Sequence, residues 1–186
     1  MSARSSLGGV LAVAGVLLLT GCAPAVGTAF GYGTGDGTGA VNGEPVQYGH
    51  DAVIGIPLDN RTADPVELLT VTPLHSVNVL FGASSVAPVL RERDGDWLSF
   101  GVNRPSDTPT LVQEWRQRKP AARYRIAGHE KNLQALLEIS VRNPARPARV
   151  VGVTIRYLQD GRVVTETTHE TACFFPKHRA SVCSLP

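Results

Sequence analysis

The chain has 186 residues, of which 42% are hydrophobic and 18% charged, and its formal net charge is +2 at pH 7. This length suits one domain with appendages, and the nearly balanced charge argues against a nucleic-acid-binding protein. Arginine supplies most of the positive charge, and Ala, Gly, Pro and Val are abundant. Such a composition is typical of a GC-rich bacterial genome.

Residues 1–21 are predicted to be an export signal. Residues 1–6 are polar with one positive charge at Arg4, and residues 7–19 are apolar or small throughout. This run has the length of a signal-peptide core, and it is shorter than the roughly 20 residues that a membrane-spanning helix needs. The alternative is an uncleaved anchor helix, which the polar, Gly-rich sequence from Gly27 onward disfavours.

The apolar run ends in Leu19-Thr20-Gly21-Cys22. These four residues resemble the lipobox of bacterial lipoproteins, in which Leu, a small residue and Gly or Ala precede a Cys. The resemblance covers residues 1 to about 25. It implies that the Cys22 thiol receives a diacylglyceryl group, with acyl chains such as palmitate, and that cleavage leaves Cys22 at the new N-terminus.

A lipidated Cys22 predicts a protein anchored on the extracytoplasmic face of a cell membrane. Each buried methylene contributes about 0.8 kcal/mol, so two or more acyl chains hold a protein firmly without a spanning helix. If the source is a Gram-negative bacterium, Ala23 leaves the choice between the two membranes open.

Residues 22–45 are expected to form a flexible linker behind the lipid. Gly recurs nearly every second residue and large apolar residues are scarce, so such a stretch buries too little surface to offset its ordering entropy. The alternative is a calcium-binding glycine repeat around Asp36. Because that repeat needs several Asp residues and a sustained period, the linker is the preferred interpretation.

From Val46 onward, short runs rich in Val, Ile, Leu and Thr alternate with turn residues, a pattern that predicts strands. Ala52, Ile54, Ile56 and Leu58 alternate on one face of the first strand, and Asp-Gly pairs at 94–95 and 160–161 are hairpin signals. No long window has the 3.6-residue period of a helix. The expected strands are 52–58, 66–72, 77–81, 86–91, 97–102, 110–115, 122–127, 135–142, 148–158 and 163–168.

Two segments of the chain resemble each other. Residues 54–72 and 137–154 both contain an apolar alternation, an Asn, a turn that ends in Pro and a second apolar run. Asn60 corresponds to Asn143, and Pro65 to Pro147. Two separate β domains of this size would each be marginally stable, so we expect two similar hairpin-like units inside one sandwich, rather than a tandem repeat of domains.

The strand pattern predicts an all-β fold, an antiparallel immunoglobulin-like (Ig-like) β-sandwich over residues 46–186. Residues 153–164, VTIRYLQDGRVV, resemble the late strands of Ig-like domains in bacterial secreted lipoproteins. The resemblance lies in the pattern, because the Cys…Trp…Cys spacing of antibody domains is absent. Trp97 and Trp115 are expected to pack in the core or at an edge.

Cys173 and Cys183 remain after Cys22 is assigned to lipid. An even pair in an exported domain predicts a disulfide, which would close a short C-terminal loop and contribute roughly 2–3 kcal/mol. The alternative is a copper or zinc site formed by Cys173, His178 and Cys183, since this spacing resembles the Cys-x-His-x-Met loop of cupredoxins. That family places Met where this chain has Cys183, and it needs a second His from elsewhere, with His50, His75 and His129 as the candidates.

Motifs for catalysis were sought along the whole chain, and the sequence holds neither a Gly-x-Ser-x-Gly elbow nor a phosphate-binding Gly-rich loop. His129-Glu130 and His169-Glu170 begin like a zinc-protease motif but lack its second His. Asp94 and Asp96 lie in a predicted turn, where Asp is favoured for backbone reasons. We therefore expect a non-catalytic lipoprotein without a cofactor that binds a protein or cell-envelope partner. The alternatives are the copper or zinc carrier, and a hydrolase with an unrecognised site.

Overall fold

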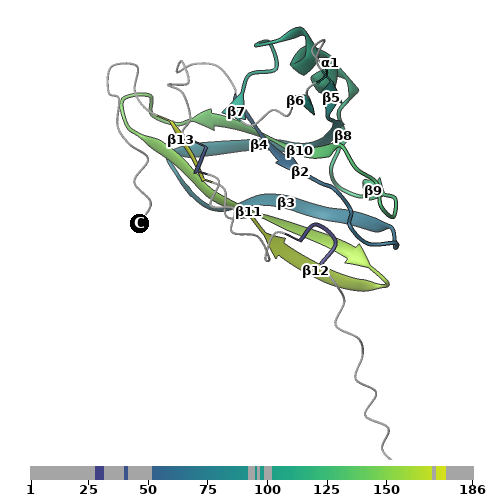
Figure 1. The fold of residues 1–186 in the computed structure, drawn as a ribbon. Coiled ribbons are helices and arrows are strands. Elements are labelled where there is room, and N and C mark those ends of the chain that lie inside the picture. The colour runs from purple at the N-terminus through teal and green to yellow at the C-terminus, as the bar shows by residue number, and fades with distance from the viewer. Residues whose placement is uncertain are drawn as a thin grey trace, which may run out of the picture.

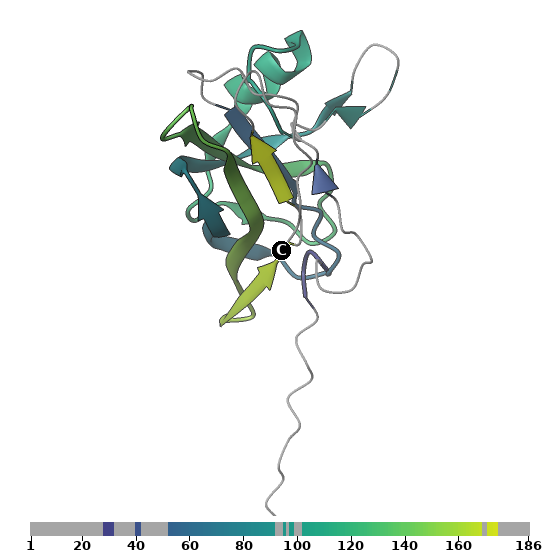
Figure 2. The ribbon, with the colours of Figure 1, turned by 90° about the vertical axis from the view of Figure 1, so that its left-hand side faces the viewer.

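The computed structural model describes residues 28–31, 40–41, 52–91, 95, 97–98, 102–168 and 171–174. These residues form two β-sheets packed face to face, with a short helix on the outside of one of them (Figure 1). The predicted all-β sandwich is confirmed. Figure 2 shows the same two layers after a quarter turn.

The described strands divide between the two sheets and a small ribbon. Sheet A has six strands and sheet B has five, and each pairing is antiparallel except that of β1 with β13. Sheet A runs in the order β1 (Ala40–Val41), β13 (Thr171–Phe174), β11 (Ala148–Gln159), β3 (Val66–Val77) and β9 (Arg125–Ile126), and β12 (Arg162–Thr167) also pairs with β11. Sheet B runs in the order β7 (Val102–Asn103), β2 (Ala52–Pro57), β10 (Leu133–Val141), β4 (Val79–Pro88) and β8 (Lys119–Pro120). The ribbon pairs β5 (Leu90–Arg91) with β6 (Trp97–Leu98).

Both predicted hairpins are present. Gln159 pairs with Arg162 across a two-residue turn in which Asp160 has φ 49° and Gly161 has φ 72°. A positive φ at both turn residues is the geometry that Asp-Gly favours, because it matches the twist of the flanking strands. The other Asp-Gly signal, at 94–95, lies between the paired strands β5 and β6.

The two similar segments build the centre of one sandwich. Each passes from sheet B to sheet A: the first joins β2 to β3, and the second joins β10 to β11. The copies then pair with each other, β2 with β10 and β3 with β11. The expectation of a single sandwich is confirmed, but each unit is an arch between the sheets rather than a hairpin, because its own strands do not pair.

An asparagine organises the turn of each arch. Asn60 Oδ1 accepts a hydrogen bond from the Thr62 backbone N–H at 3.0 Å, and Asn143 Oδ1 accepts one from the Ala145 N–H at 3.0 Å. Both are Asx turns, in which the side chain satisfies a backbone donor two residues on. The matching Asn residues in the sequence therefore correspond to matching local structure.

One continuous core lies between the sheets. It includes Ala52, Ile54, Ile56 and Leu58, which confirms the predicted buried face of the first strand. The largest fully buried side chain is that of Tyr157 on β11. A second, smaller cluster of Val53, Ala87, Leu111 and Leu136 lies on the opposite face of sheet B, under the helix.

The predicted strand 110–115 is wrong, because this segment belongs to helix α1 (Pro109–Gln117). Thr108 caps the helix, since its Oγ1 accepts a hydrogen bond from the Leu111 N–H at 3.2 Å, and Pro109 occupies the first turn, where a missing N–H costs nothing. With nine residues, α1 is too short to show a long apolar stripe.

The predicted strands 77–81 and 122–127 are wrong in extent. Asn78 has φ 57° and separates β3 in sheet A from β4 in sheet B. Its side-chain amide holds this corner, because Nδ2 donates to Asn143 O at 2.8 Å and Oδ1 accepts from the Asn143 N–H at 2.9 Å. In the second segment Arg123 has φ 64°, and the paired strand β9 is confined to Arg125–Ile126.

Candidate functional site

Cys173 is the one cysteine among the residues that the structure describes. Cys173 lies on β13 and is buried. Cys22, Cys183 and His178 lie outside the described residues, so the predicted lipidation, the predicted pairing with Cys183 and the three-residue metal set stay predictions.

The candidate histidines and acids do not come together in the part of the chain that the structure describes. His75 is exposed on β3, and His129 is exposed in a loop where its φ is 58°. No group of three or more His, Cys, Asp or Glu residues within metal-binding distance occurs among the described residues. His50, Asp94, Asp96, His169 and Glu170 lie outside them.

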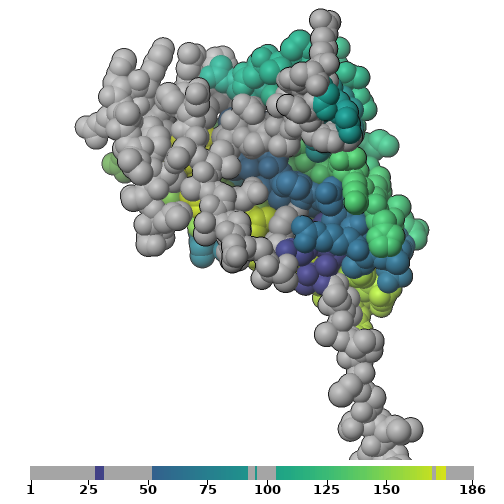
Figure 3. Space-filling view, in the orientation of Figure 1, coloured from purple at the N-terminus to yellow at the C-terminus, as the bar shows by residue number. Residues whose placement is uncertain are grey.

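The structure assigns part of the predicted linker to the folded domain. Ala29 and Phe30 are 0% and 2% exposed and belong to the main core. The expectation of an unpacked coil is therefore wrong for residues 28–31. In the space-filling view this segment (purple) lies directly against the blue atoms of the β2–β3 region (Figure 3).

Hydrogen bonds join this segment to strands β11 and β12 and to the loop that follows β2. The Ala29 N–H donates to Tyr157 Oη at 2.8 Å, and the Phe30 N–H donates to Glu166 Oε1 at 3.0 Å. On the other side, the Arg61 N–H donates to Ala29 O at 2.8 Å. Because buried backbone groups need partners, these bonds allow residues 29–30 to lie inside the sandwich.

Tyr157 is the centre of this contact. Its hydroxyl donates to Glu166 Oε1 at 2.6 Å while it accepts from Ala29, and its ring meets that of Phe30 edge to face, with centroids 5.1 Å apart. Burial raises the pKa of the Tyr157 hydroxyl far above its ordinary value, and the Glu166 carboxylate acts in the same direction. The phenol therefore stays protonated and serves as a structural donor.

A second buried polar group holds α1 on sheet B. The Glu114 side chain is fully buried; Oε1 accepts from the Leu90 N–H at 2.6 Å, and Oε2 accepts from Gln134 Nε2 at 2.8 Å. Burial raises the Glu114 pKa, and the two hydrogen bonds only partly offset that effect. A carboxyl group with its pKa raised in this way can act as an acid or base, but here both oxygens are engaged in fixing the helix.

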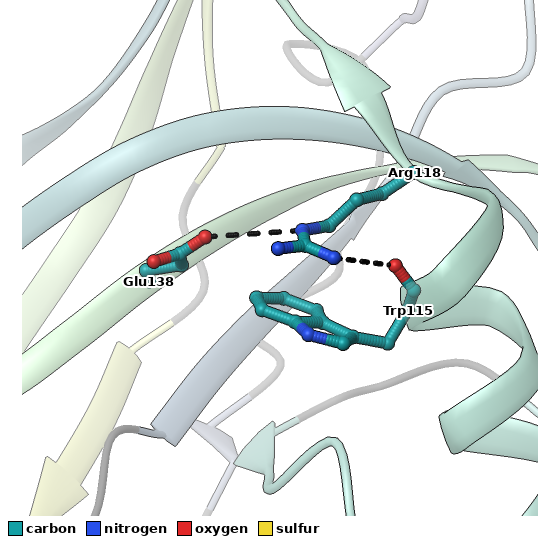
Figure 4. Close-up of polar contacts among 3 residues, drawn as sticks. All are labelled: Trp115, Arg118 and Glu138. Atoms are coloured by element: carbon teal, nitrogen blue, oxygen red, sulfur yellow. Dashed lines mark hydrogen bonds and ion pairs between the residues drawn. The ribbon is translucent and has the colours of Figure 1, made fainter.

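The C-terminal end of α1 and strand β10 of sheet B together form a cluster of three residues, which we call the helix-edge cluster: Trp115, Arg118 and Glu138. The Arg118 guanidinium carbon lies 3.7 Å from the centroid of the Trp115 ring, and Arg118 Nε lies 4.0 Å from Glu138 Oε1 (Figure 4). Arg118 also donates to Trp115 O at 2.8 Å. The cluster is partly exposed, so the Arg118–Glu138 ion pair is worth at most about 1 kcal/mol.

The surface next to the cluster is open and partly apolar. Glu138 faces Gly82 on β4, where an added Cβ would lie 3.0 Å from the Glu138 Cβ. Leu80, which pairs with Ser140 on the same sheet, is 48% exposed. Trp115 is half-buried and packs against the small apolar core between α1 and sheet B, which agrees with its predicted packing role. This combination of a Trp, an Arg and an exposed apolar side chain suits a contact surface better than a reaction centre.

Sequence reasoning missed the residues that organise these features. Phe30 stands alone in a Gly-rich tract, and the burial of Glu114 and Glu166 has no local signal, because their partners come from distant strands. The Thr108-Pro109 pair before α1 was a readable helix start.

No family model matches the chain, and no curated protein matches it significantly. Within the part that the structure describes, α1 is the one helix, and it is too short and too polar to cross a membrane.

Proposed function

We propose that the chain is an exported lipoprotein, anchored through lipid on Cys22 to the extracytoplasmic face of the cell membrane. In this proposal it binds a protein or cell-envelope partner and does no chemistry of its own. The observation that carries the proposal is the lipobox Leu19-Thr20-Gly21-Cys22 at the end of an apolar run of signal-peptide length. The start of the buried core at Ala29, a few residues after Cys22, fits a cleaved signal.

We place the partner contact at the helix-edge cluster and the neighbouring strands of sheet B. Trp and Arg are the residue types that dominate binding energy at protein interfaces. Trp115 and Arg118 are held in place by their mutual stacking and by the burial of Glu114 beneath α1. A surface fixed in advance loses less entropy on binding. The exposed Leu80 side chain would add an apolar contact beside the cluster.

The proposal includes a disulfide at Cys173, which would exclude the metal carrier. A cysteine binds copper or zinc as a thiolate, and a disulfide-bonded Cys173 has no thiolate to offer. We propose Cys183 as its partner, which leaves Cys22 for lipid. An Ig-like arrangement of the sandwich likewise remains part of the proposal.

The anchor is tested by expressing the full chain in a bacterium that processes lipoproteins, with Cys22→Ser as the test variant and Thr20→Ser as its control. We expect the natural chain and Thr20→Ser to be in the membrane fraction and to incorporate a labelled fatty acid. The Cys22→Ser variant should lose the label, because serine offers no thiol for acylation. Unlabelled natural protein in the soluble fraction would contradict the proposal.

The contact surface is tested with a photo-crosslinking residue at Gln117, an exposed position at the end of α1, in cells of the native host. The control position is Thr72, exposed on sheet A. We expect a crosslinked product from position 117 that Arg118→Ala abolishes, and no such product from position 72. The same products from both positions, or a product that persists in Arg118→Ala, would rule out this surface.

A further inference from the structure

The distance between the lipid anchor and the folded domain follows from where the core begins. Residues 23–27 are the residues between Cys22 and Thr28, the first described residue of the docked segment. An extended chain covers at most about 3.6 Å per residue, so these few residues reach at most about 20 Å. A coil through the whole predicted linker would instead reach about 25–30 Å on average and much further when extended.

The docked segment is fixed to one end of the sandwich, which we call the tether end: residues 28–31 together with the loop 60–64. Ala29 O accepts from the Arg61 N–H, and the Arg61 side chain covers Gly31, since an added Cβ there would lie 2.6 Å from Arg61 Nη1. Asn60 stabilises the same loop, because its Nδ2 donates hydrogen bonds to Asp64 O and to Ala127 O, each at 2.9 Å. Thr28, where the chain from Cys22 reaches the domain, therefore begins a segment that is fixed to the sandwich.

Helix α1 lies on the other side of the molecule. Phe30 packs between the sheets against Tyr157 of sheet A, whereas α1 covers the outer face of sheet B. Figures 1 and 2 both show α1 well separated from residues 28–31. Two packed sheets are about 10 Å apart, so Phe30 lies about 5 Å from the layer of sheet B, and a helix adds about 10 Å outside that sheet. The layer that holds Phe30 and the layer of α1 are therefore about 15 Å apart.

We propose that the tether end rests against the lipid headgroups, and that the helix-edge cluster faces away from the membrane toward its partner. This inference rests on the proposed lipid anchor. Charge contributes little to the contact, because Arg61 and Asp64 offset each other in the loop. The small number of residues between Cys22 and the docked segment is what would hold the tether end near the bilayer surface.

The test measures the height of two positions in the natively processed, full-length protein, reconstituted into phosphatidylcholine vesicles that contain a headgroup-quencher lipid. A fluorophore is attached at Ala63→Cys in the tether end or at Gln113→Cys on α1, both exposed positions. We expect quenching at position 63 to exceed that at position 113 by about twofold or more, since short-range quenching falls steeply over a separation of about 15 Å.

Two further variants separate the tether from other causes. A Gly-Ser insertion of about 20 residues after Pro24 adds about 25 Å of average reach, and it should make the two positions equally quenched. Phe30→Ala should reduce the difference by releasing the docked segment, whereas Thr28→Ala, at an exposed position, should leave it unchanged. Equal quenching in the natural protein, or a difference that survives the insertion, would overturn the short tether. Failure of the protein to float with the vesicles would instead overturn the lipid anchor.

Discussion

The hydroxyl of Tyr157 accepts a 2.8 Å hydrogen bond from the backbone N–H of Ala29, a residue 128 positions earlier in the chain. Through this bond the segment that contains Ala29 is held by β11, the first strand of the β11–β12 hairpin. Because Phe30 follows directly and fills the core beside the same ring, the N-terminal segment is a structural part of the sandwich. The stability of the fold should therefore depend on residues that sequence composition assigns to a linker.

Replacing Phe30 with Ala should strongly destabilise the domain. The side chain is buried in the main core, and removal of such a ring costs about 3–5 kcal/mol. Urea unfolding followed by circular dichroism measures the effect. Thr28→Ala, at an exposed position in the same segment, is the control and should change the free energy of unfolding by no more than about 0.5 kcal/mol. Similar midpoints for both variants would show that the segment does not stabilise the fold.

Replacing Tyr157 with Phe tests the hydrogen bonds separately from the packing. The change keeps the ring but leaves the Ala29 N–H without its acceptor, and Glu166 Oε1 without one of its donors. A buried group left without its partner costs about 1–3 kcal/mol. Tyr124→Phe is the control, because no hydrogen bond of the Tyr124 hydroxyl is found among the described residues. A Tyr157→Phe variant as stable as the natural protein would contradict the role of the hydroxyl.

Glu114 should make the domain less stable as the pH rises. Burial raises the pKa of Glu114 in the folded state above its ordinary value of 4.5, so the folded protein holds the proton more tightly than the unfolded chain does. This contribution is fully present below the unfolded pKa and is lost as the pH rises through the raised folded pKa. Glu114→Gln keeps an acceptor for the Leu90 N–H and carries no charge.

The stability difference between Glu114→Gln and the natural protein should therefore shift in favour of the variant from pH 4 to pH 8. Urea unfolding at several pH values in this range measures it. Glu114→Ala is the comparison, and it should be less stable throughout, because it removes the acceptor of the Leu90 N–H and the Glu114 bond of Gln134 Nε2. A difference between Glu114→Gln and the natural protein that stays constant with pH would contradict a raised Glu114 pKa.

Gly128→Ala should disrupt the loop beside the tether end. A Cβ at Gly128 would overlap the backbone oxygen of Ala63, a contact that the backbone must move to relieve. The same loop donates from the His129 N–H to Thr62 O at 2.8 Å, so this bond should be lost as well. Gly161→Ala is the control: its Cβ would meet nothing within 4 Å, and only its φ of +72° is unfavourable, at about 1–2 kcal/mol. Thermal unfolding should show the larger loss for Gly128→Ala, and the reverse order would refute the close approach.

The strands and turns of the two similar segments and the Asp-Gly hairpin could be predicted because each has a local signal. That each segment is an arch between the sheets, rather than a hairpin, could not be predicted in this way. Alternation defines the buried faces, and Asn and Asp-Gly define the turns. Helix α1 was missed because its nine residues carry few apolar side chains, and one of its buried positions is the charged Glu114. Its packing depends on Gln134 and Leu90, which no local pattern reveals.

The docking of residues 28–31 could not be predicted for a related reason. A single Ala-Phe pair in a Gly-rich tract has no periodicity, and its partners Tyr157 and Glu166 come from the far end of the chain. The burial of Ala29 and Phe30 depends on side chains that come together only when the two sheets pack, so no local sequence pattern predicts it.

The measurement that tests the account most directly is intact and peptide-level mass spectrometry, without reduction, of the protein purified after native processing. It reports the N-terminus and the state of all three cysteines. The account predicts a chain that begins at an acylated Cys22, with Cys173 linked to Cys183. An unmodified Cys22, or a disulfide between Cys173 and Cys22, would contradict the lipid anchor on which the proposed function and the short tether depend.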